Sequence, residues 1–300
     1  MLDKFSQLCC MSQKDLKKYV ALELAKTHTD VRKENGFVFA KGTFPVLLVA
    51  HLDTVHNELP NIITFDPQTQ ALSSSNGIGG DDRCGVYMIL EIIKKYNCSV
   101  LFCEDEEIGG KGAEKFTKTK LSKNLSFNYI IEFDRKGSND AVFYDCDNPD
   151  FTKFITKEFY ETAYGTFSDI SVIAPYLGCA AVNLSCGYYK AHTKDEYVVF
   201  SEMEDSIDAA CKILERTTEE DKFDYIEDEF SFKFEPYLYG DEFYDDHSKY
   251  FLMQYVNQRG MEDWFEVDAV STEEAIGIFC INHPNLSFNN IIDIQCDEDM

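Results

Sequence analysis

The chain has 300 residues, 44% of them hydrophobic, which is enough for one large domain and a smaller appended part. It carries 28 basic and 54 acidic residues, for a formal net charge of −26. That charge repels phosphate backbones and anionic lipid headgroups, so it argues against nucleic acid and membrane surfaces as partners.

The eleven cysteines indicate a reducing compartment. They form no Cys-x-x-Cys pair, and most lie in apolar runs, which is typical of buried, reduced thiols. The first residues lack the charged and apolar regions of a signal peptide, and no apolar run approaches the roughly 20 residues of a membrane span. We therefore expect a cytoplasmic protein.

Predicted strands and helices alternate along the first two-thirds of the chain. The hydrophobic spacing predicts helices over about 12–26, 84–96, 109–119, 170–176 and 203–216. Short apolar runs predict strands over 37–40, 46–50, 99–103, 129–134 and 180–184. This alternation predicts an α/β fold, a three-layer sandwich around a largely parallel mixed sheet.

The composition changes after Arg216. Between Thr217 and Asp246, twelve acidic residues stand against two lysines, among interspersed Phe and Tyr. We therefore expect three parts: a main domain (1–216), an acidic connector (217–248) and a small α+β appendage (249–300). In the appendage we expect two strands between Tyr250 and Val270, a helix from Thr272 and a closing strand that ends near Ile294.

Two segments that combine metal ligands with turns occur early in the main domain. The strand 46–50 leads into His51-Leu52-Asp53, where a neutral imidazole can bind zinc and Asp53 can accept its other ring N–H. The glycine-rich segment 77–85 contains Asp81-Asp82-Arg83 and lacks the Gly-Lys-Ser/Thr ending of a phosphate loop, so its carboxylates suit a cation. Each segment alone is equally compatible with an ordinary polar turn.

Three further segments follow later strands. Glu104-Asp105-Glu106-Glu107 comes directly after the strand 99–103, and four adjacent carboxylates there repel one another unless a cation neutralises them. A solvated acidic loop is the alternative. Glu132-Phe133-Asp134 closes the strand 129–134, and His192 follows the strand 180–184. Because five successive strand ends offer hard or borderline ligands, the sequence predicts a zinc site at this edge of the sheet.

In these residues the chain resembles the di-zinc aminopeptidases, carboxypeptidases and deacylases of the phosphorylase/hydrolase-like fold. The resemblance covers about residues 10–215. Its most specific parts, in the family's order, are His51-Leu52-Asp53-Thr54-Val55, Asp81-Asp82-Arg83 and Glu106-Glu107-Ile108-Gly109. Gly165-Thr166-Phe167-Ser168-Asp169 is similar, less closely, to the family's loop on the substrate side.

The resemblance implies two zinc ions, with cobalt or manganese as substitutes. One ion would be held by His51, Asp81 and Asp134, and the other by Asp81, Glu107 and His192. It also implies that Glu106 is the general base and that Asp53 orients His51. Glu132 lies on the same strand face as Asp134, and the family uses either Asp or Glu there, so Glu132 is the alternative ligand.

The resemblance further implies hydrolysis of an amide bond. Only 58 positions separate Asp134 from His192, too few for the lid domain of many deacylases and carboxypeptidases. The layout therefore favours an aminopeptidase acting on peptides, with an N-acyl amino acid deacylase as the alternative. There are two further alternatives: a catalytically silent zinc-binding interaction protein, and a single-metal acyltransferase or cyclase. The sequence gives no indication of the oligomeric state.

Overall fold

A computed structural model describes residues 2–165, 167–227, 249–256, 261–269 and 290–296, and positions 275, 278, 279 and 286. The chain divides into two compact units, Met1–Ser231 and Phe232–Met300. Among the described residues, no helix is both long and apolar enough to cross a membrane.

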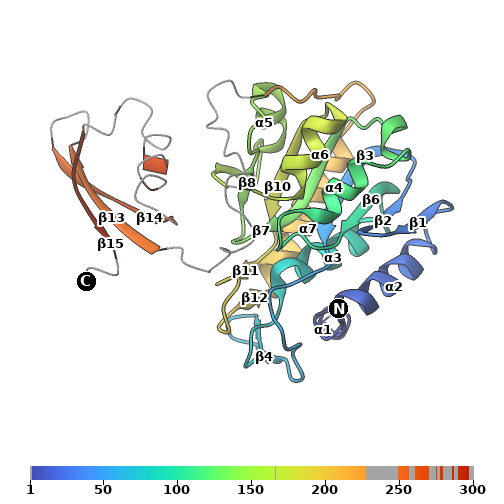
Figure 1. The fold of residues 1–300 in the computed structure, drawn as a ribbon, viewed down its shortest axis with the longest axis horizontal. Helices are drawn as coiled ribbons and strands as arrows, with labels where there is room; N and C mark the ends of the chain where they lie inside the picture. Colours follow the sequence, from blue (N-terminus) through green and yellow to red (C-terminus); the bar gives the residue numbers. More distant parts are fainter. Residues whose placement is uncertain are drawn as a thin grey trace. The chain divides into compact units, whose positions relative to one another are not determined.

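The first unit is built on a mixed sheet (Figure 1). Across the described residues, eight strands form it in the order β1-β2-β6-β3-β7-β10-β8-β9. Their bounds are β1 Val31–Glu34, β2 Phe37–Ala40, β3 Phe44–His51, β6 Cys98–Cys103, β7 Tyr129–Arg135, β8 Asp140–Val142, β9 Glu161–Ala163 and β10 Ala181–Ser185. The central strands β6, β3, β7 and β10 run parallel, whereas β2 joins β6 and β8 joins β10 in the antiparallel sense.

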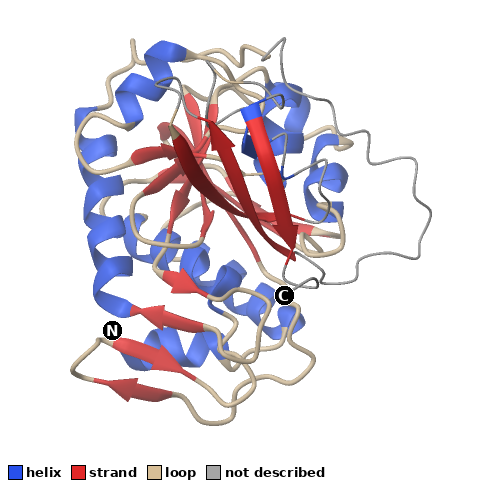
Figure 2. Ribbon diagram, turned by 90° about the vertical axis from the view of Figure 1, so that its left-hand side faces the viewer, coloured by secondary structure: helices blue, strands red, loops and turns tan. Residues whose placement is uncertain are grey.

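Helices cover both faces of this sheet (Figure 2). One face packs against α1 (Leu2–Cys9), α2 (Gln13–Leu24), α3 (Gly80–Ile92), α5 (Pro149–Ile155) and α7 (Phe200–Arg216). The other face packs against α4 (Lys111–Thr117) and α6 (Asp169–Leu177). The predicted three-layer α/β sandwich around a largely parallel mixed sheet is therefore confirmed.

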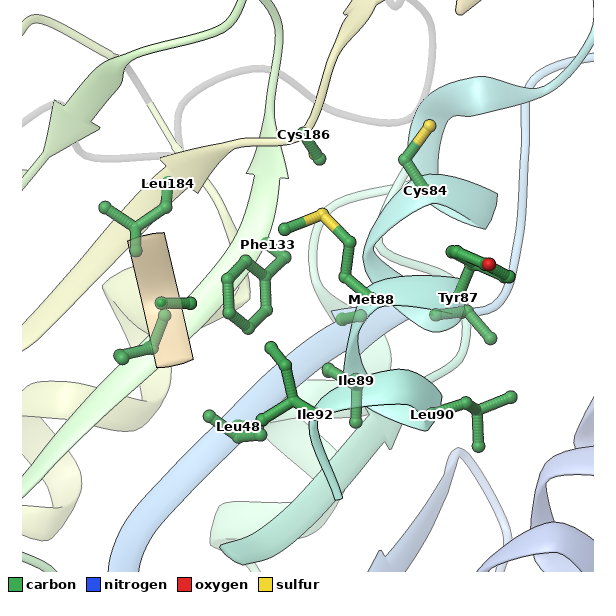
Figure 3. Close-up of a cluster of buried hydrophobic side chains, with 14 of the residues drawn as sticks. Leu48, Cys84, Tyr87, Met88, Ile89, Leu90, Ile92, Phe133, Leu184 and Cys186 are labelled. Carbon is green, nitrogen blue, oxygen red and sulfur yellow. The ribbon is translucent and has the colours of Figure 1, made fainter. Parts of the chain in front are cut away.

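The core between α3 and the central strands fixes where that helix begins. Met88 and Ile92 of α3 share one buried cluster with Leu48 of β3, Phe133 of β7 and Leu184 of β10, in which Met88 lies beside Phe133 and Ile92 beside Leu48 (Figure 3). Such close-packed contacts leave the helix little freedom to slide. Asp81, in the first turn of α3, lies beside His51, the last residue of β3, so the start of the helix stands at the carboxyl end of this strand.

Several short elements gave no signal in the sequence. They include α1, α5, the strands β1, β8 and β9 of the main sheet, and a small antiparallel sheet of β4 (Thr64–Asp66), β5 (Ala71–Ser73), β11 (Tyr188–Tyr189) and β12 (Tyr197–Val199). Strands of two to four residues are too short to show an alternating pattern. Helix α3 also begins four residues earlier than expected, because the turn with Asp81 and Asp82, whose backbone angles are not helical, is continuous with it.

The second unit contains a separate antiparallel sheet in the order β14-β13-β15. Its strands are β13 (Lys249–Val256), β14 (Glu262–Ala269) and β15 (Ile291–Cys296). Phe251, Met253 and Tyr255 alternate along β13 and pack in a small core with Phe279. The expected strands thus occur, while most of the helix expected from Thr272 lies outside the described residues.

Residues 218–227 run along the first unit. The ring of Phe223 packs against Tyr129, Phe151 and Phe154, at centroid distances of 6.2, 5.2 and 5.2 Å. Its backbone accepts a hydrogen bond from the N–H of Ala180 and donates one to the carbonyl of Asn128. This part of the expected connector therefore packs as part of the main domain, and we propose a domain boundary beyond residue 227.

Replacing Phe223 by Ala tests this boundary. The variant Phe223→Ala should lower the free energy of unfolding of the first unit by about 2–4 kcal/mol, as expected for losing a partly buried aromatic ring that packs against the core. Urea unfolding of the full chain measures the change. Leu22→Ala is the control, because Leu22 is 68% exposed and its loss should have little effect. Equal stability of Phe223→Ala and wild type would place the boundary near Arg216 instead.

Candidate metal centre

The register of the central strands brings the first group of candidate ligands together. Val49 of β3 pairs with Glu132 of β7, so two residues further on His51 lies beside Asp134. The distance from His51 Nε2 to Asp134 Oδ1 is 3.5 Å. His51 Nε2 also lies 3.0 Å from Asp81 Oδ1, at the start of α3. Ligand atoms of these three buried or nearly buried residues lie within 4.8 Å of one another.

A second group shares Asp81 with the first. His192 Nε2 lies 3.2 Å from Asp81 Oδ2 and 3.0 Å from Glu107 Oε2. Ligand atoms of Asp81, Glu107 and His192 also lie within 4.8 Å of one another. Each oxygen of Asp81 therefore faces a different imidazole, as a carboxylate between two cations would.

The structure separates the two carboxylates on β7. Asp134 belongs to the first group. Glu132 lies two residues earlier on the strand, beside Val49 of β3, and belongs to neither group. The Glu132 side chain is fully buried, and neither of its oxygens has a hydrogen-bond partner among the described residues. The geometry thus favours Asp134 over Glu132 as the ligand.

Asp53 connects the first histidine to the turn that carries the candidate base. Its Oδ1 lies 3.2 Å from His51 Nδ1 and accepts a hydrogen bond of 3.1 Å from the backbone N–H of Glu106. Its Oδ2 accepts one of 3.0 Å from the N–H of Glu107. One carboxylate therefore orients the imidazole so that Nε2 faces Asp81, and holds the turn of Glu106 and Glu107 beside it.

Several side chains that sequence reasoning did not assign support these residues. Ser168 Oγ donates a hydrogen bond of 2.9 Å to Asp134 Oδ2. The side-chain amide of Asn183 on β10 holds the backbone of Asp134, because its Oδ1 accepts from the Asp134 N–H and its Nδ2 donates to the Asp134 carbonyl. Asp82, the second acid of the pair, accepts a hydrogen bond of 3.2 Å from the backbone N–H of His51. The segments of Asp82 and Ser168 were already recognised in the sequence. Their hydrogen bonds to His51 and Asp134 could not be, because these partners lie 31 and 34 residues away.

The buried charges of the site suit bound cations. Burial and the neighbouring charge of Asp81 raise the pKa of Asp134 to about 7. Burial, together with the charges of Asp134, Asp169 and Glu107, raises the pKa of Glu106 well above its ordinary value. Glu107 Oε1 is buried without a hydrogen-bond partner among the described residues. Converging carboxylates of this kind favour divalent metal ions, and the His and carboxylate set fits zinc.

Both histidines face carboxylates that favour the protonated imidazole. Hydrogen bonds to Asp81 and Glu107 raise the pKa of His192 to about 11. Burial acts to lower the pKa of His51, but the charge of Asp134 and hydrogen bonds to Asp134, Asp53 and Asp81 outweigh it and hold this pKa well above 6.5. A metal would therefore displace protons from both imidazoles.

This competition makes metal binding depend on pH. Affinity for Zn²⁺ or Co²⁺ should rise between pH 6 and 8, by up to about tenfold per pH unit for each proton released. Isothermal titration calorimetry in buffers of different ionisation enthalpy counts these protons. His192→Ala should release fewer protons than wild type. Binding that is independent of pH would contradict the assignment of the imidazoles as ligands.

A comparison of two alanine variants tests the choice of carboxylate on β7. Asp134→Ala should weaken metal binding by about 10–100-fold or more, because a direct ligand is lost. Glu132→Ala should weaken it much less, since this side chain belongs to neither group. Metal content after dialysis, measured by mass spectrometry, decides between them. The reverse order of effects would identify Glu132 as the ligand.

No protein-family model and no curated protein sequence matches this chain. Solved structures do share its fold. Aminopeptidase PepT from Bacillus cereus ATCC 10987 is 13% identical, with a TM-score of 0.60, covering 71% of this chain and 97% of its own. A tripeptidase from Staphylococcus aureus is 13% identical, with a TM-score of 0.56, and the match covers 71% of this chain and 96% of the tripeptidase.

A third example is an aminopeptidase from the archaeon Desulfurococcus kamchatkensis, 14% identical, with a TM-score of 0.57, covering 72% of this chain and 94% of its own. At such low identity these similarities establish the fold and leave the chemistry to the residues of the site. The resemblance seen in the sequence is confirmed at this level: the first unit has the fold of these peptidases.

Proposed function

We propose that this protein is a zinc-dependent peptidase with two metal ions in one site, and that it acts as an aminopeptidase. The observation that carries the proposal is the pair of ligand groups that share Asp81, with Glu106 in the turn beside them. His51, Asp81 and Asp134 would hold one ion, and Asp81, Glu107 and His192 the other. Zinc ions held by these residues would supply activation of the attacking water and polarisation of the scissile carbonyl.

Each remaining task in hydrolysis has its own residue. Glu106 accepts the proton of the attacking water and later delivers it to the leaving amine. Its burial among carboxylates raises its pKa, which suits a group that must both take and give a proton near neutral pH. Asp53 keeps Glu106 in place through its backbone N–H and keeps His51 in the tautomer that presents Nε2.

The peptide is favoured over other amides as substrate for two reasons. The solved structures of the same fold include proteins described as aminopeptidases and a tripeptidase. In addition, the described residues between Asp134 and His192 form short elements of the main unit and contain no inserted domain. A panel of aminoacyl-p-nitroanilides, tripeptides and N-acyl amino acids tests this choice, and turnover of only the N-acyl compounds would identify a deacylase.

The variant Glu106→Gln separates the proposed base from the ligands. It keeps the size of the side chain but cannot accept the proton, so kcat should fall by roughly 10²–10⁴-fold. Metal content and the thermal unfolding midpoint should stay close to those of wild type. Activity assays with excess Zn²⁺, together with metal analysis, measure both effects.

Glu107→Gln is the matched control, because it makes the same chemical change at the adjacent residue. It should lose metal as well as activity, since Glu107 belongs to the second ligand group. If Glu106→Gln turned over substrate normally, or lost metal as readily as Glu107→Gln, the two roles would be wrongly divided. A wild type that binds metal but hydrolyses no member of the panel would favour a binding protein instead.

A further inference from the structure

Glu196 is a fully buried carboxylate outside both ligand groups. It follows His192 by four residues and is 1% exposed as a whole residue. Its Oε1 accepts a hydrogen bond of 3.0 Å from the backbone N–H of Asp81. Its Oε2 accepts one of 2.8 Å from the backbone N–H of Gly79 and lies 2.7 Å from His56 Nε2. Both oxygens therefore accept hydrogen bonds from the backbone of the segment that carries Asp81, and Oε2 also contacts the His56 ring.

These bonds join two segments that are far apart in sequence. The distance along the chain from Glu196 to Asp81 is 115 residues. A backbone hydrogen bond of 2.9 Å from the N–H of Gly77 to the carbonyl of Lys194 adds to the connection. The segment that carries His192 is thus fastened at several points to the segment that carries Asp81.

The His56 ring packs directly against the backbone of Gly77. A Cβ atom at Gly77 would lie 2.2 Å from the His56 ring, so the ring rests directly on the glycine backbone. Gly77 also has a φ of +84°, which glycine adopts without strain. The absence of a side chain at Gly77 therefore leaves room for the His56 ring, whose Nε2 lies 2.7 Å from Glu196 Oε2.

The two ligand groups differ in how they are supported. His51 and Asp134 belong to central strands, whose positions are fixed by the sheet. His192 lies in a loop, its side chain is 43% exposed, and its φ is +64°. The second group therefore depends more on contacts that hold its loop than the first group does.

We propose that Glu196 is a positioning residue for the second metal ion, the one assigned to Asp81, Glu107 and His192. By binding the N–H of Asp81 and lying in the His192 segment, it sets the distance between these two ligands before metal arrives. This inference rests on the proposed function, because it presupposes that two ions bind.

Titration with Co²⁺ of the full-length protein tests the proposal, with absorption spectra to resolve the two binding constants. Glu196→Gln keeps the length of the side chain but turns one acceptor into a donor that faces an N–H group. Glu196→Asp keeps the charge but shortens the reach by one methylene. Both variants should weaken the second Co²⁺ by about 10–100-fold and change the first by less than about threefold.

Glu91→Gln is the control variant. Glu91 lies near the other end of α3 and pairs with Lys4 and Lys94, so the same change there should leave both constants unaltered. Equal weakening of both ions in the Glu196 variants would indicate general destabilisation and overturn the proposal. Wild-type constants in both variants would overturn it as well.

Hydrogen–deuterium exchange of the wild-type protein tests the same idea if the variants do not fold. The amides of Gly79 and Asp81 should be protected already in the metal-free protein, because Glu196 accepts their hydrogen bonds, and rapid exchange of both amides would contradict the proposal. A wild type that binds fewer than two ions would instead refute the proposed function and this inference with it. A wild type that binds two ions, with unaffected Glu196 variants, would refute this inference alone.

Discussion

The site is organised around one carboxylate that two imidazoles share. Asp81 presents Oδ1 to His51 and Oδ2 to His192, and both contacts depress its pKa although burial acts to raise it. A buried cluster of Asp, Glu and His is stable only when opposite charges balance, whether protons or metal ions supply them. The fold must therefore hold three separate chain segments at this one carboxylate.

Two kinds of support provide this arrangement. The parallel pairing of β3 with β7 fixes His51 and Asp134, and the buried core beneath α3 fixes the start of the helix at the edge of the sheet. The contacts of Asp53 and Glu196 act on the turns instead, where the sheet itself gives no support. In α/β sheets, ligands bind at the carboxyl ends of strands for this reason: rigid strands meet adaptable loops there.

The fold and the proposed metal-dependent hydrolysis are supported by different observations. Structures at 13–14% identity establish that the first unit folds as several peptidases do. The proposal of metal-dependent hydrolysis rests on this chain's own residues: two ligand groups, a carboxylate between them and an adjacent acid with a raised pKa. The second unit, with its antiparallel sheet β14-β13-β15, contributes no residue to this argument.

Features that depend on residues adjacent in the chain could be predicted before the fold was known. Apolar runs such as 46–50 and 99–103 predicted buried strands, and the acids and histidines directly after them predicted a metal site at one edge of the sheet. The order of these segments was sufficient for the family resemblance. Strand and helix patterns are local, so they can be recognised without knowing the fold.

Features that depend on contacts between distant segments became visible in the folded chain alone. The register of β3 against β7 separates Asp134 from Glu132, which the alternating pattern of a single strand places on the same face. Phe223 belongs to the main unit because its ring packs against Tyr129, although its acidic surroundings in the sequence predicted a connector. The contact of Glu196 with Asp81 joins segments 115 residues apart. No local pattern encodes such pairings, because they arise only when the folded chain brings the segments together.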